Sequence, residues 1–264
     1  MPDQARSKVY FASDMHLGSP SEGDPREREL RVVRWLKSIR DDAAALVLAG
    51  DIFDYWFEYD TVAPQGFVRL LGALAELSDA GVEIHYFTGN HDIWLFGYLE
   101  REIGFTLHRE AALLAFFGKR FFIAHGDEYE TENKSYQRLR KLFHARWAQR
   151  LYALIHPDLT VRFARRWSRH SRKKATERYP IVPYKGENEE YLTRFAKAEA
   201  RRPGDEAPDF YIFGHRHLLL DLMITRRTRV IILGDWLHYN SYGVWDGEHF
   251  LLKQFETEGD PEQD

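Results

Sequence analysis

Carboxylate, amide and imidazole side chains recur directly after short apolar segments that have the pattern of buried strands. The clearest case is the apolar run 46–49, which is followed by Gly50 and Asp51. Such a run predicts a strand buried on both faces, and the glycine lets the backbone turn sharply. Asp51 would then stand at the carboxyl end of the strand, where open α/β sheets place their ligand sites. A single Gly-Asp pair is also typical of an ordinary turn.

Four further predicted strands end in polar groups of the same kind. The strand over 8–13 runs into Asp14 and His16, 83–87 into Asn90, His91 and Asp92, 120–124 into His125 and Asp127, and 209–213 into His215 and His217. Each motif alone has a plain explanation as a turn. Because the carboxyl ends of parallel strands share one edge of a sheet, the five sets can converge. Oxygen and imidazole ligands suit a divalent metal, and the chain has no cysteine to supply a thiolate.

The segments between these strands predict the elements that position them. Apolar residues at helical spacing predict helices over 26–40 and 64–80, with Pro64 in the first turn of the second, and a helical pattern over 93–103. A β-hairpin is expected over 111–124, and four consecutive antiparallel strands over 218–224, 230–233, 236–245 and 249–255. The chain is therefore expected to have an α/β fold.

Residues 128–208 interrupt the alternation of strands and helices. Between Arg138 and Arg178, thirteen Lys or Arg residues face two acids, which gives a charge of +11 in a chain of net charge −4. Apolar residues at helical spacing predict two helices that separate at 156–157 and a further helix over 187–200. An ordinary solvated basic face would explain the charge. The functional alternatives are a cap over an anionic substrate and a patch for anionic lipid.

Length and composition set the broad class. With 264 residues, of which 44% are hydrophobic, the chain suits one domain with an insertion. The first residues lack the apolar core of a signal peptide, and no uncharged run approaches the length of a membrane span. We therefore expect a cytoplasmic protein, with peripheral contact to the inner face of the cytoplasmic membrane.

In their order along the chain, the five motifs resemble those of the calcineurin-like metallophosphoesterases, and the resemblance extends from Val9 to Trp245. It implies an α/β sandwich of two sheets flanked by helices (αββα), with two metals at the common edge of the sheets. We expect a single domain over 1–264 with a helical cap insertion over 130–205.

The same resemblance implies a role for each motif residue. It assigns Asp14, His16 and His217 to one metal, Asn90, His125 and His215 to the other, and Asp51 to a bridge between them. A shared carboxylate offsets part of the repulsion between cations roughly 3.5–4 Å apart. We expect two Mn²⁺ ions, although Fe or Zn also fits these ligands. His91 is expected to act as an acid or hydrogen-bond donor to the phosphate or leaving oxygen. Asp54, Asp92 and Asp127 are candidates to orient ligand imidazoles, or are structural.

A closer resemblance is to the UDP-2,3-diacylglucosamine pyrophosphatases of lipid A biosynthesis, which release UMP and the lipid 1-phosphate. It is carried by His125-Gly126-Asp127, Thr131, Tyr136-Gln137-Arg138, the basic insertion and the Leu-Gly-Asp-Trp stretch at 233–236. It implies a nucleotide-linked lipid substrate, contact with an anionic membrane, and substrate contacts at Asn133, Tyr136, Ser171 and Arg178. The chain departs from the well-known branch, which has arginine at the place of His91, aspartate at Asn133, asparagine at Ala175 and lysine at Arg178.

Other functions stay open at the level of sequence. A phosphodiesterase or phosphatase of this fold that acts on a soluble nucleotide would have a small polar pocket, whereas an acyl-chain tunnel under the segment 138–178 would favour the lipid. A scaffold protein of this fold has an eroded metal site, but here every ligand position is filled. The basic segment could attract nucleic acid, yet no base-reading motif accompanies it, so we expect neither nucleic acid nor an obligate protein partner.

Overall fold

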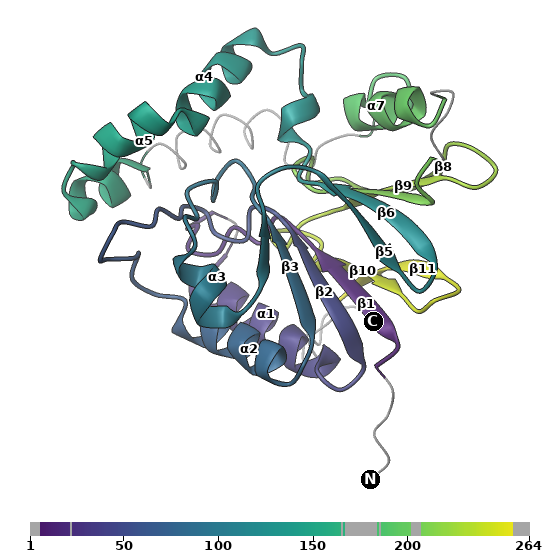
Figure 1. Cartoon of the computed structure of the whole chain (residues 1–264), viewed down its shortest axis with the longest axis horizontal. Helices are drawn as coiled ribbons and strands as arrows, with labels where there is room; N and C mark the ends of the chain where they lie inside the picture. Colours follow the sequence, from purple (N-terminus) through teal and green to yellow (C-terminus); the bar gives the residue numbers. More distant parts are fainter. Residues whose placement is uncertain are drawn as a thin grey trace.

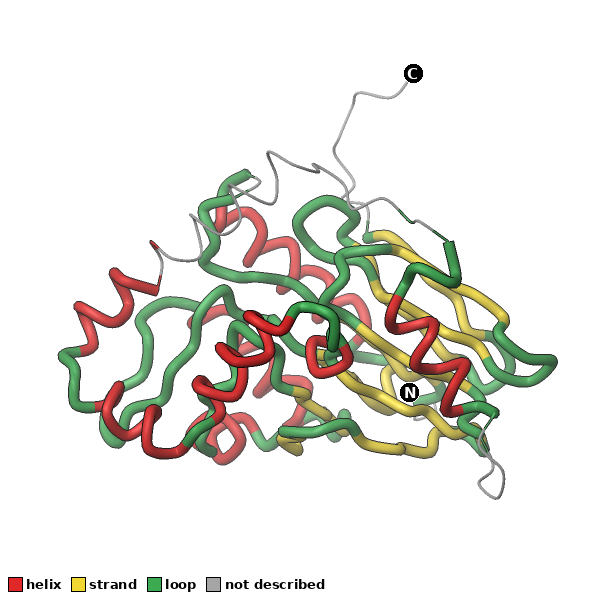
Figure 2. The backbone as a smooth tube through the Cα atoms, turned by 90° about the horizontal axis from the view of Figure 1, so that it is seen from above, coloured by secondary structure: helices red, strands yellow, loops and turns green. Residues whose placement is uncertain are grey.

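Two mixed sheets pack face to face, and helices lie outside them (Figures 1 and 2). The computed structural model describes residues 6–21, 23–164, 166, 184, 186–201 and 207–255. The first sheet has the order β11-β10-β1-β2-β3-β4, and the second has the order β5-β6-β7-β9-β8. The expected α/β sandwich of two sheets is thereby confirmed.

Each sheet has a parallel centre. The first contains β1 (Lys8–Ala12), β2 (Ala43–Ala49), β3 (Glu83–Phe87) and β4 (Thr106–His108), which are parallel, and β10 (Ser241–Trp245) and β11 (Phe250–Gln254), which are added antiparallel. The second contains the parallel strands β6 (Lys119–Ala124), β7 (Phe210–Phe213) and β9 (Arg229–Leu233), with β5 (Ala112–Phe116) and β8 (Leu219–Met223) antiparallel at the edges. Parallel strands of both sheets therefore carry the predicted motifs.

Helices cover the outer faces of the sandwich (Figure 1). The first sheet is covered by α1 (Pro25–Ile39), α2 (Val68–Asp79) and α3 (Tyr98–Ile103), and the second by α7 (Tyr191–Glu199). The 3₁₀ turn η1 (Asp127–Tyr129) follows β6 and leads to α4 (Lys134–His144) and α5 (Arg146–Ala153), which lie across the top of the view in Figure 1.

Alternation along the central strands explains why the two sheets pack together. Val9 and Phe11 of β1 face the second sheet, whereas Tyr10 and Ala12 face the helices of the first. Strand β2 alternates in the same way, so both of its faces are apolar. A side-chain period of two with both faces buried is what a central parallel strand requires, and it explains the unbroken apolar run before Gly50.

Three predictions about elements were wrong. The four last strands are not one antiparallel run, since the chain leaves the second sheet after Leu233 and enters the first at Ser241. Helix α2 begins at Val68, because Gly66 and Phe67 adopt left-handed backbone. Helix α3 is shorter than predicted, because the carboxylate of the buried Glu58 accepts hydrogen bonds from the backbone before and at its start.

The helices of the predicted cap are divided differently from the prediction. Extended backbone at Ala145 separates α4 from α5, and a further helical stretch covers 157–164. Apolar spacing continues across Ala145, so the pattern did not reveal this break. Helix α7, which the predicted insertion includes, packs on the outer face of the second sheet.

Phe121 tests the packing between the sheets. It is fully buried and stacks on Phe210, with ring centroids 4.7 Å apart, and on Phe11, at 5.4 Å. Phe121→Ala should lower the free energy of unfolding by about 3–5 kcal/mol, because it leaves a cavity at the centre of the core. Phe117→Ala is the matched control: this ring is 46% exposed, and its loss should cost less than about 0.5 kcal/mol. Urea denaturation followed by circular dichroism compares them, and similar costs for both would contradict this account of the core.

Candidate active site

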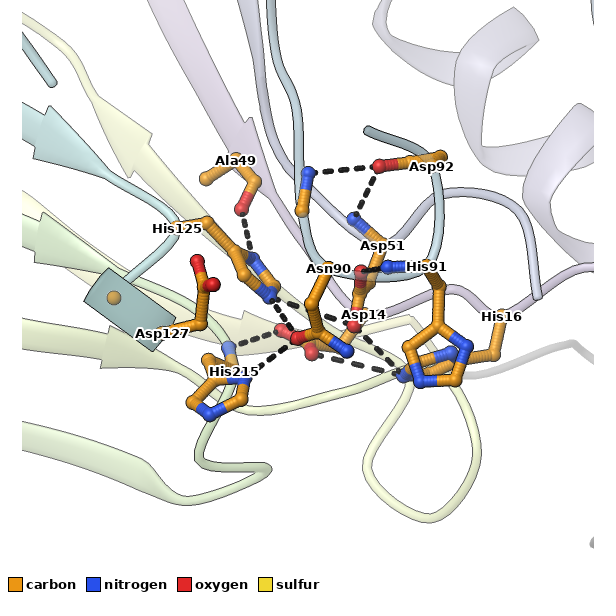
Figure 3. Close-up of polar contacts among 12 residues, drawn as sticks. Asp14, His16, Ala49, Asp51, Asn90, His91, Asp92, His125, Asp127 and His215 are labelled. Atoms are coloured by element: carbon orange, nitrogen blue, oxygen red, sulfur yellow. Dashed lines mark hydrogen bonds and ion pairs between the residues drawn. The ribbon is translucent and has the colours of Figure 1, made fainter. Parts of the chain in front are cut away.

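The predicted metal ligands and His91 meet where the carboxyl ends of β1, β2, β3, β6 and β7 come together (Figure 3). These strands belong to both sheets, so the site lies at the edge that the sheets share. Backbone hydrogen bonds join the strand ends directly: Asp14 N–H donates to Gly50 O, His16 N–H to Asp51 O, and Gly214 N–H to His125 O, at 2.9–3.0 Å. The loops that carry the site are therefore held to one another as well as to their own strands.

One group of side chains gathers around Asp14. The Nε2 atoms of His16 and His217 lie 3.2 Å apart, and they are 3.7 and 3.5 Å from Oδ1 of Asp14. The other carboxylate oxygen of Asp14 accepts a hydrogen bond from the backbone N–H of His215 at 2.9 Å. The predicted first set of ligands is thus brought together in space.

A second group gathers around Asp51. Oδ2 of Asp51 lies 3.4 Å from Nε2 of His125 and 3.7 Å from Nε2 of His16, so this carboxylate stands between the two groups. Oδ1 of Asn90 lies 2.9 Å from Nδ1 of His215 and 3.3 Å from Nε2 of His125. Among the described residues, Asp51, His125 and His215 have ligand atoms that all lie within 4.8 Å of one another. The predicted second set is also brought together.

The backbone is strained at several of the residues that carry these groups. Asp14, His16, Asp51, His215 and His217 all have left-handed backbone, with φ between 44 and 64°. Asp and His enter this region more readily than most residues, but each such position still stores strain. Gly89 is required for a different reason: a Cβ there would lie 2.2 Å from Oδ1 of Asp51. The loop of β3 can therefore approach Asp51 only with a glycine at this position.

Hydrogen bonds to the far side of two rings decide which nitrogen faces the centre. Nδ1 of His125 donates to the carbonyl oxygen of Ala49 at 2.9 Å, and Nδ1 of His217 donates to Oδ2 of Asp235 at 2.9 Å. Carbonyl and carboxylate oxygens only accept, so in the neutral rings the lone pairs sit on the Nε2 atoms. These lone pairs face the carboxylates of Asp51 and Asp14.

The residues present fit divalent cations. Oδ1 of Asp14 is buried and accepts no hydrogen bond from any described residue, although a buried carboxylate oxygen without a partner is costly. It faces two imidazole nitrogens that are themselves 3.2 Å apart. A cation among these atoms would satisfy the carboxylate and both nitrogens together, and nitrogen with oxygen is a donor set of Mn, Fe and Zn sites.

The pKa values show how strongly these groups interact. Burial acts to raise the pKa of Asp51, but His125 and His91 hold it well below its usual range. Burial acts to lower the pKa of His125, but the carboxylates of Asp51 and Asp14 raise it well above its usual range. Burial raises the pKa of Asp14, and the charge of Asp51 adds to this effect. Two buried carboxylates so close together create a negative potential that favours bound cations.

His91 lies beside the two groups. Its backbone N–H donates to Oδ1 of Asp51 at 2.8 Å, and its ring Nδ1 donates to the carbonyl oxygen of Asp54 at 2.8 Å. The ring stands edge-on to His16 with centroids 4.9 Å apart. A nitrogen of this ring also lies within 4.8 Å of ligand atoms of His16 and Asp51, so its position allows either a contact to substrate or a metal bond.

The three aspartates that were candidates to orient imidazoles have different surroundings. Asp92 accepts hydrogen bonds from the backbone N–H groups of Asp51, Ile52, Phe53 and Gly89 and from the hydroxyl of Tyr86, so it fixes the Asp51 loop and orients no ligand imidazole. Burial and the charge of Asp51 raise its pKa to about 6. Asp127 accepts from Tyr136 and from Arg140 at 2.6 Å, which ties α4 to the site. Asp54 lies 3.8 Å from Nδ1 of His16 and of His91.

The predicted substrate contacts are placed less completely. Asn133 is exposed and its Oδ1 caps α4 by accepting from the backbone N–H of Tyr136. The ring of Tyr136 lies 6.2 Å from that of His215, at the rim of the site. Ser171, Ala175 and Arg178 lie outside the described residues.

Asp235 is a site residue that the sequence reasoning missed. It follows β9 and is fully buried, and Oδ2 contacts Nδ1 of both His217, at 2.9 Å, and His238, at 3.0 Å. Its Oδ1 accepts from three backbone N–H groups of the next turn. Burial acts to raise its pKa, but the hydrogen bonds of His217 and His238 lower it well below the usual range. The signal was present, since Val230–Leu233 followed by Gly234 and Asp235 repeats the apolar run and Gly-Asp of the second strand.

Comparison with known proteins adds the family. Residues 7–219 match the model of the calcineurin-like phosphoesterases. The chain belongs to this family. It is 47% identical over 260 residues, 95% of this chain and 98% of that protein, to a Porphyromonas gingivalis protein named UDP-2,3-diacylglucosamine hydrolase. Proteins of the same name from Neisseria meningitidis serogroup B and Photorhabdus laumondii are 31% and 28% identical, and the matches cover 89% and 88% of this chain and 91% and 92% of those proteins.

Family membership makes this chain a metal-dependent hydrolase of phosphate esters or anhydrides, and the calcineurin-like phosphoesterase site is dimetal. The two groups of converging ligand atoms around Asp14 and Asp51 are where its residues could hold such metals.

Asp235 supplies a test of the site that needs no substrate. Asp235→Ala removes the acceptor that orients His217, so Mn²⁺ affinity should fall about 10- to 100-fold. Calorimetric titration of the metal-free protein with Mn²⁺ measures this change. The control is Asp246→Ala, which also removes an acceptor of backbone N–H groups but lies at the other end of β10. Equal Mn²⁺ affinity in both variants would show that Asp235 does not act on the metal site.

Proposed function

We propose that this chain hydrolyses the pyrophosphate bond of UDP-2,3-diacylglucosamine and yields UMP and 2,3-diacylglucosamine 1-phosphate. The observation that carries the proposal is the 47% identity to a UDP-2,3-diacylglucosamine hydrolase over 95% of this chain. A complete set of converging ligand atoms supports hydrolysis, because the donors that a dimetal phosphoesterase uses are all present. The product of such a reaction feeds lipid A biosynthesis.

In this proposal, Asp14, His16 and His217 hold one cation, Asn90, His125 and His215 hold the other, and Asp51 is shared. Mn²⁺ is the metal we propose, and Fe and Zn are the alternatives that the same donors allow. Two divalent cations held there would supply a nucleophilic hydroxide near neutral pH and neutralise charge on the phosphate oxygens. Asp92 keeps the Asp51 loop in place through its five hydrogen bonds, so the shared carboxylate does not have to be ordered during the reaction.

His91 is the residue we assign to the departing group. Its Nδ1 is committed to the carbonyl oxygen of Asp54, so Nε2 is the nitrogen that can face a substrate. Because the proton on Nδ1 is held by Asp54, a ring that donates from Nε2 carries protons on both nitrogens. The ring can then donate a hydrogen bond or a proton to the phosphate or the leaving oxygen.

A large cavity supports the lipid part of the substrate. It has a volume of about 640 Å³ and lies between the loop 57–63, the start of α3 and α5 of the predicted cap. Its apolar wall includes Phe57, Val62, Phe96 and Tyr98, and arginines of α3 and α5 line it as well. A volume of this size is in the usual range for organic ligands, and apolar side chains beside charged ones suit an acyl chain next to a charged group.

The predicted cap combines anchoring to the catalytic domain with an exposed apolar face. Trp94 stacks on Tyr152 and donates from Nε1 to the carbonyl oxygen of Phe143, so α4 and α5 are fastened to the site loop. Trp147, Leu151 and Leu154, at helical spacing, are each more than half exposed. None of the helices in the described part of the chain has the length and apolarity that a membrane crossing requires. We propose that this face and the cations of 138–178 make peripheral contact with an anionic membrane.

Two site variants test the reaction. Purified protein with Mn²⁺ is incubated with UDP-linked lipids and with soluble nucleotides, and UMP is measured. Asp51→Ala should abolish turnover and deplete both metals, because one carboxylate serves both. His91→Ala should keep its metals and lose turnover by roughly 10²- to 10⁴-fold.

Each result has a contrary outcome. An empty or half-filled site in His91→Ala would make this residue a ligand, and normal turnover in folded Asp51→Ala would refute the mechanism. Faster cleavage of a soluble nucleotide than of the diacyl substrate would instead identify a nucleotide phosphodiesterase or phosphatase.

The cap is tested by sedimentation with vesicles. Vesicles rich in phosphatidylglycerol should bind the protein at low salt and release it at high salt, since each cation near the surface contributes about 1 kcal/mol and salt screens it. Leu151→Ser with Leu154→Ser should weaken binding, whereas Leu251→Ser, an exposed leucine of β11, should not. Reversing the charges of Arg165, Arg166 and Arg169 should also weaken it without changing cleavage of a soluble diester. Absence of binding at every salt concentration would remove the membrane contact.

A further inference from the structure

The loop Gly214–His217 presents two of the predicted metal ligands on strained backbone. His215 and His217 both have left-handed backbone, with φ of 64 and 47°, and only one residue separates them. Conformations of this kind persist where the surroundings over-determine them. Contacts of the two rings and of one backbone N–H hold the loop on the side of the site. On the other side the contact is made by Arg216, the residue between the two histidines.

Arg216 is held by a buried carboxylate of another element. Its Nε lies 3.1 Å from both carboxylate oxygens of Glu190, and its Nη2 donates to Oε2, also at 3.1 Å. Glu190 is only 4% exposed, and the guanidinium lies over the ring of Tyr191 at 5.7 Å from the centroid. A forked pair of this kind, with a buried carboxylate and a half-buried guanidinium, fixes direction as well as distance.

Glu190 lies next to a helix that also contacts the loop of His125. It immediately precedes α7, and Leu192 of that helix lies against Gly126, where a Cβ would come within 3.1 Å of its Cδ2. Phe195 of α7 stacks on Tyr129 of η1, with centroids 3.8 Å apart. Helix α7 therefore contacts both loops that together carry His125, His215 and His217.

We propose that Glu190 and Arg216 are positioning residues for the metal site: their ion pair holds His215 and His217 in the orientation that faces Asn90 and Asp14. The inference rests on the proposed metal-dependent hydrolysis, but it concerns affinity for metal and not the choice of substrate. Without the pair, the strained loop can relax, and the two rings lose their fixed distance from the remaining ligands. Metal affinity then falls although every ligand is still present.

The experiment titrates metal-free protein with Mn²⁺ alone by calorimetry and records thermal unfolding of the same samples. Glu190→Gln keeps the size of the side chain and removes its charge, and Arg216→Lys keeps the charge and removes the fork. Each should weaken Mn²⁺ binding about 10- to 100-fold, the size expected when a supporting contact of a metal ligand is lost. With a soluble phosphodiester, kcat should recover at saturating Mn²⁺, because the ligands and His91 are intact.

Two controls separate positioning from general stability. Asp221→Asn breaks a comparable pair, in which Nε and Nη2 of Arg229 contact the two oxygens of Asp221, at the edge of the same sheet. Phe121→Ala destabilises the core without touching the loop. Both should keep the Mn²⁺ affinity of the wild type. Should Glu190→Gln fail to fold, Arg216→Lys carries the test.

The outcomes are distinct. Unchanged Mn²⁺ affinity in Glu190→Gln and Arg216→Lys, with a lower unfolding temperature, would show that the pair is only structural and would overturn the inference. Weaker binding in the two controls as well would also overturn it, since the effect would then follow stability. A wild-type protein that binds Mn²⁺ but cleaves no UDP-linked lipid would refute the proposed substrate and leave the positioning result standing.

Discussion

The structure depends on the placement of two buried carboxylates, Asp14 and Asp51, beside imidazoles at the common edge of two sheets. Burying such charges without compensation is costly, and here backbone N–H groups and, in the proposed function, cations compensate them. The unsatisfied oxygen of Asp14 marks where protein groups alone are insufficient. A site of this kind gains binding energy for metal from the same feature that weakens the metal-free fold.

Much of the surrounding architecture serves to hold the loops at that edge. Five site residues have left-handed backbone, and the strand ends are joined by hydrogen bonds between loops of different strands. Asp92 gathers the backbone of the Asp51 loop, and Asp235 does the same for the turn after β9 while it orients His217. The two sheets meet through a core of aromatic and branched residues, so the distance between their strand ends cannot vary freely.

The predicted cap connects the site with an exposed apolar surface. Asp127 joins α4 to the second group of ligands through Tyr136 and Arg140, and α7 returns to the same region through Glu190. Between these two attachments the chain presents exposed apolar residues together with a high density of positive charge. One end of the cap therefore contacts residues of the site, while its exposed face suits a lipid surface.

The sequence by itself determined the strands that end in polar motifs, the α/β class and the residues Asp14, Asp51, His125 and His215, because an apolar run followed by a sharp turn is a local signal. It also determined the presence of a basic helical segment, since charge and periodicity are local properties. What it did not determine depends on contacts between distant residues. The chain changes sheets between Leu233 and Ser241, so the sequence did not reveal that Asp235 follows its strand as Asp51 does. Helix α3 begins only at Tyr98, because the carboxylate of Glu58 accepts hydrogen bonds from the backbone there. Glu190 contacts Arg216, which lies 26 residues away along the chain. Only the packed structure decides which site side chains contact one another. A strand end specifies an edge of a sheet, but it does not specify the distance to groups on the opposite sheet.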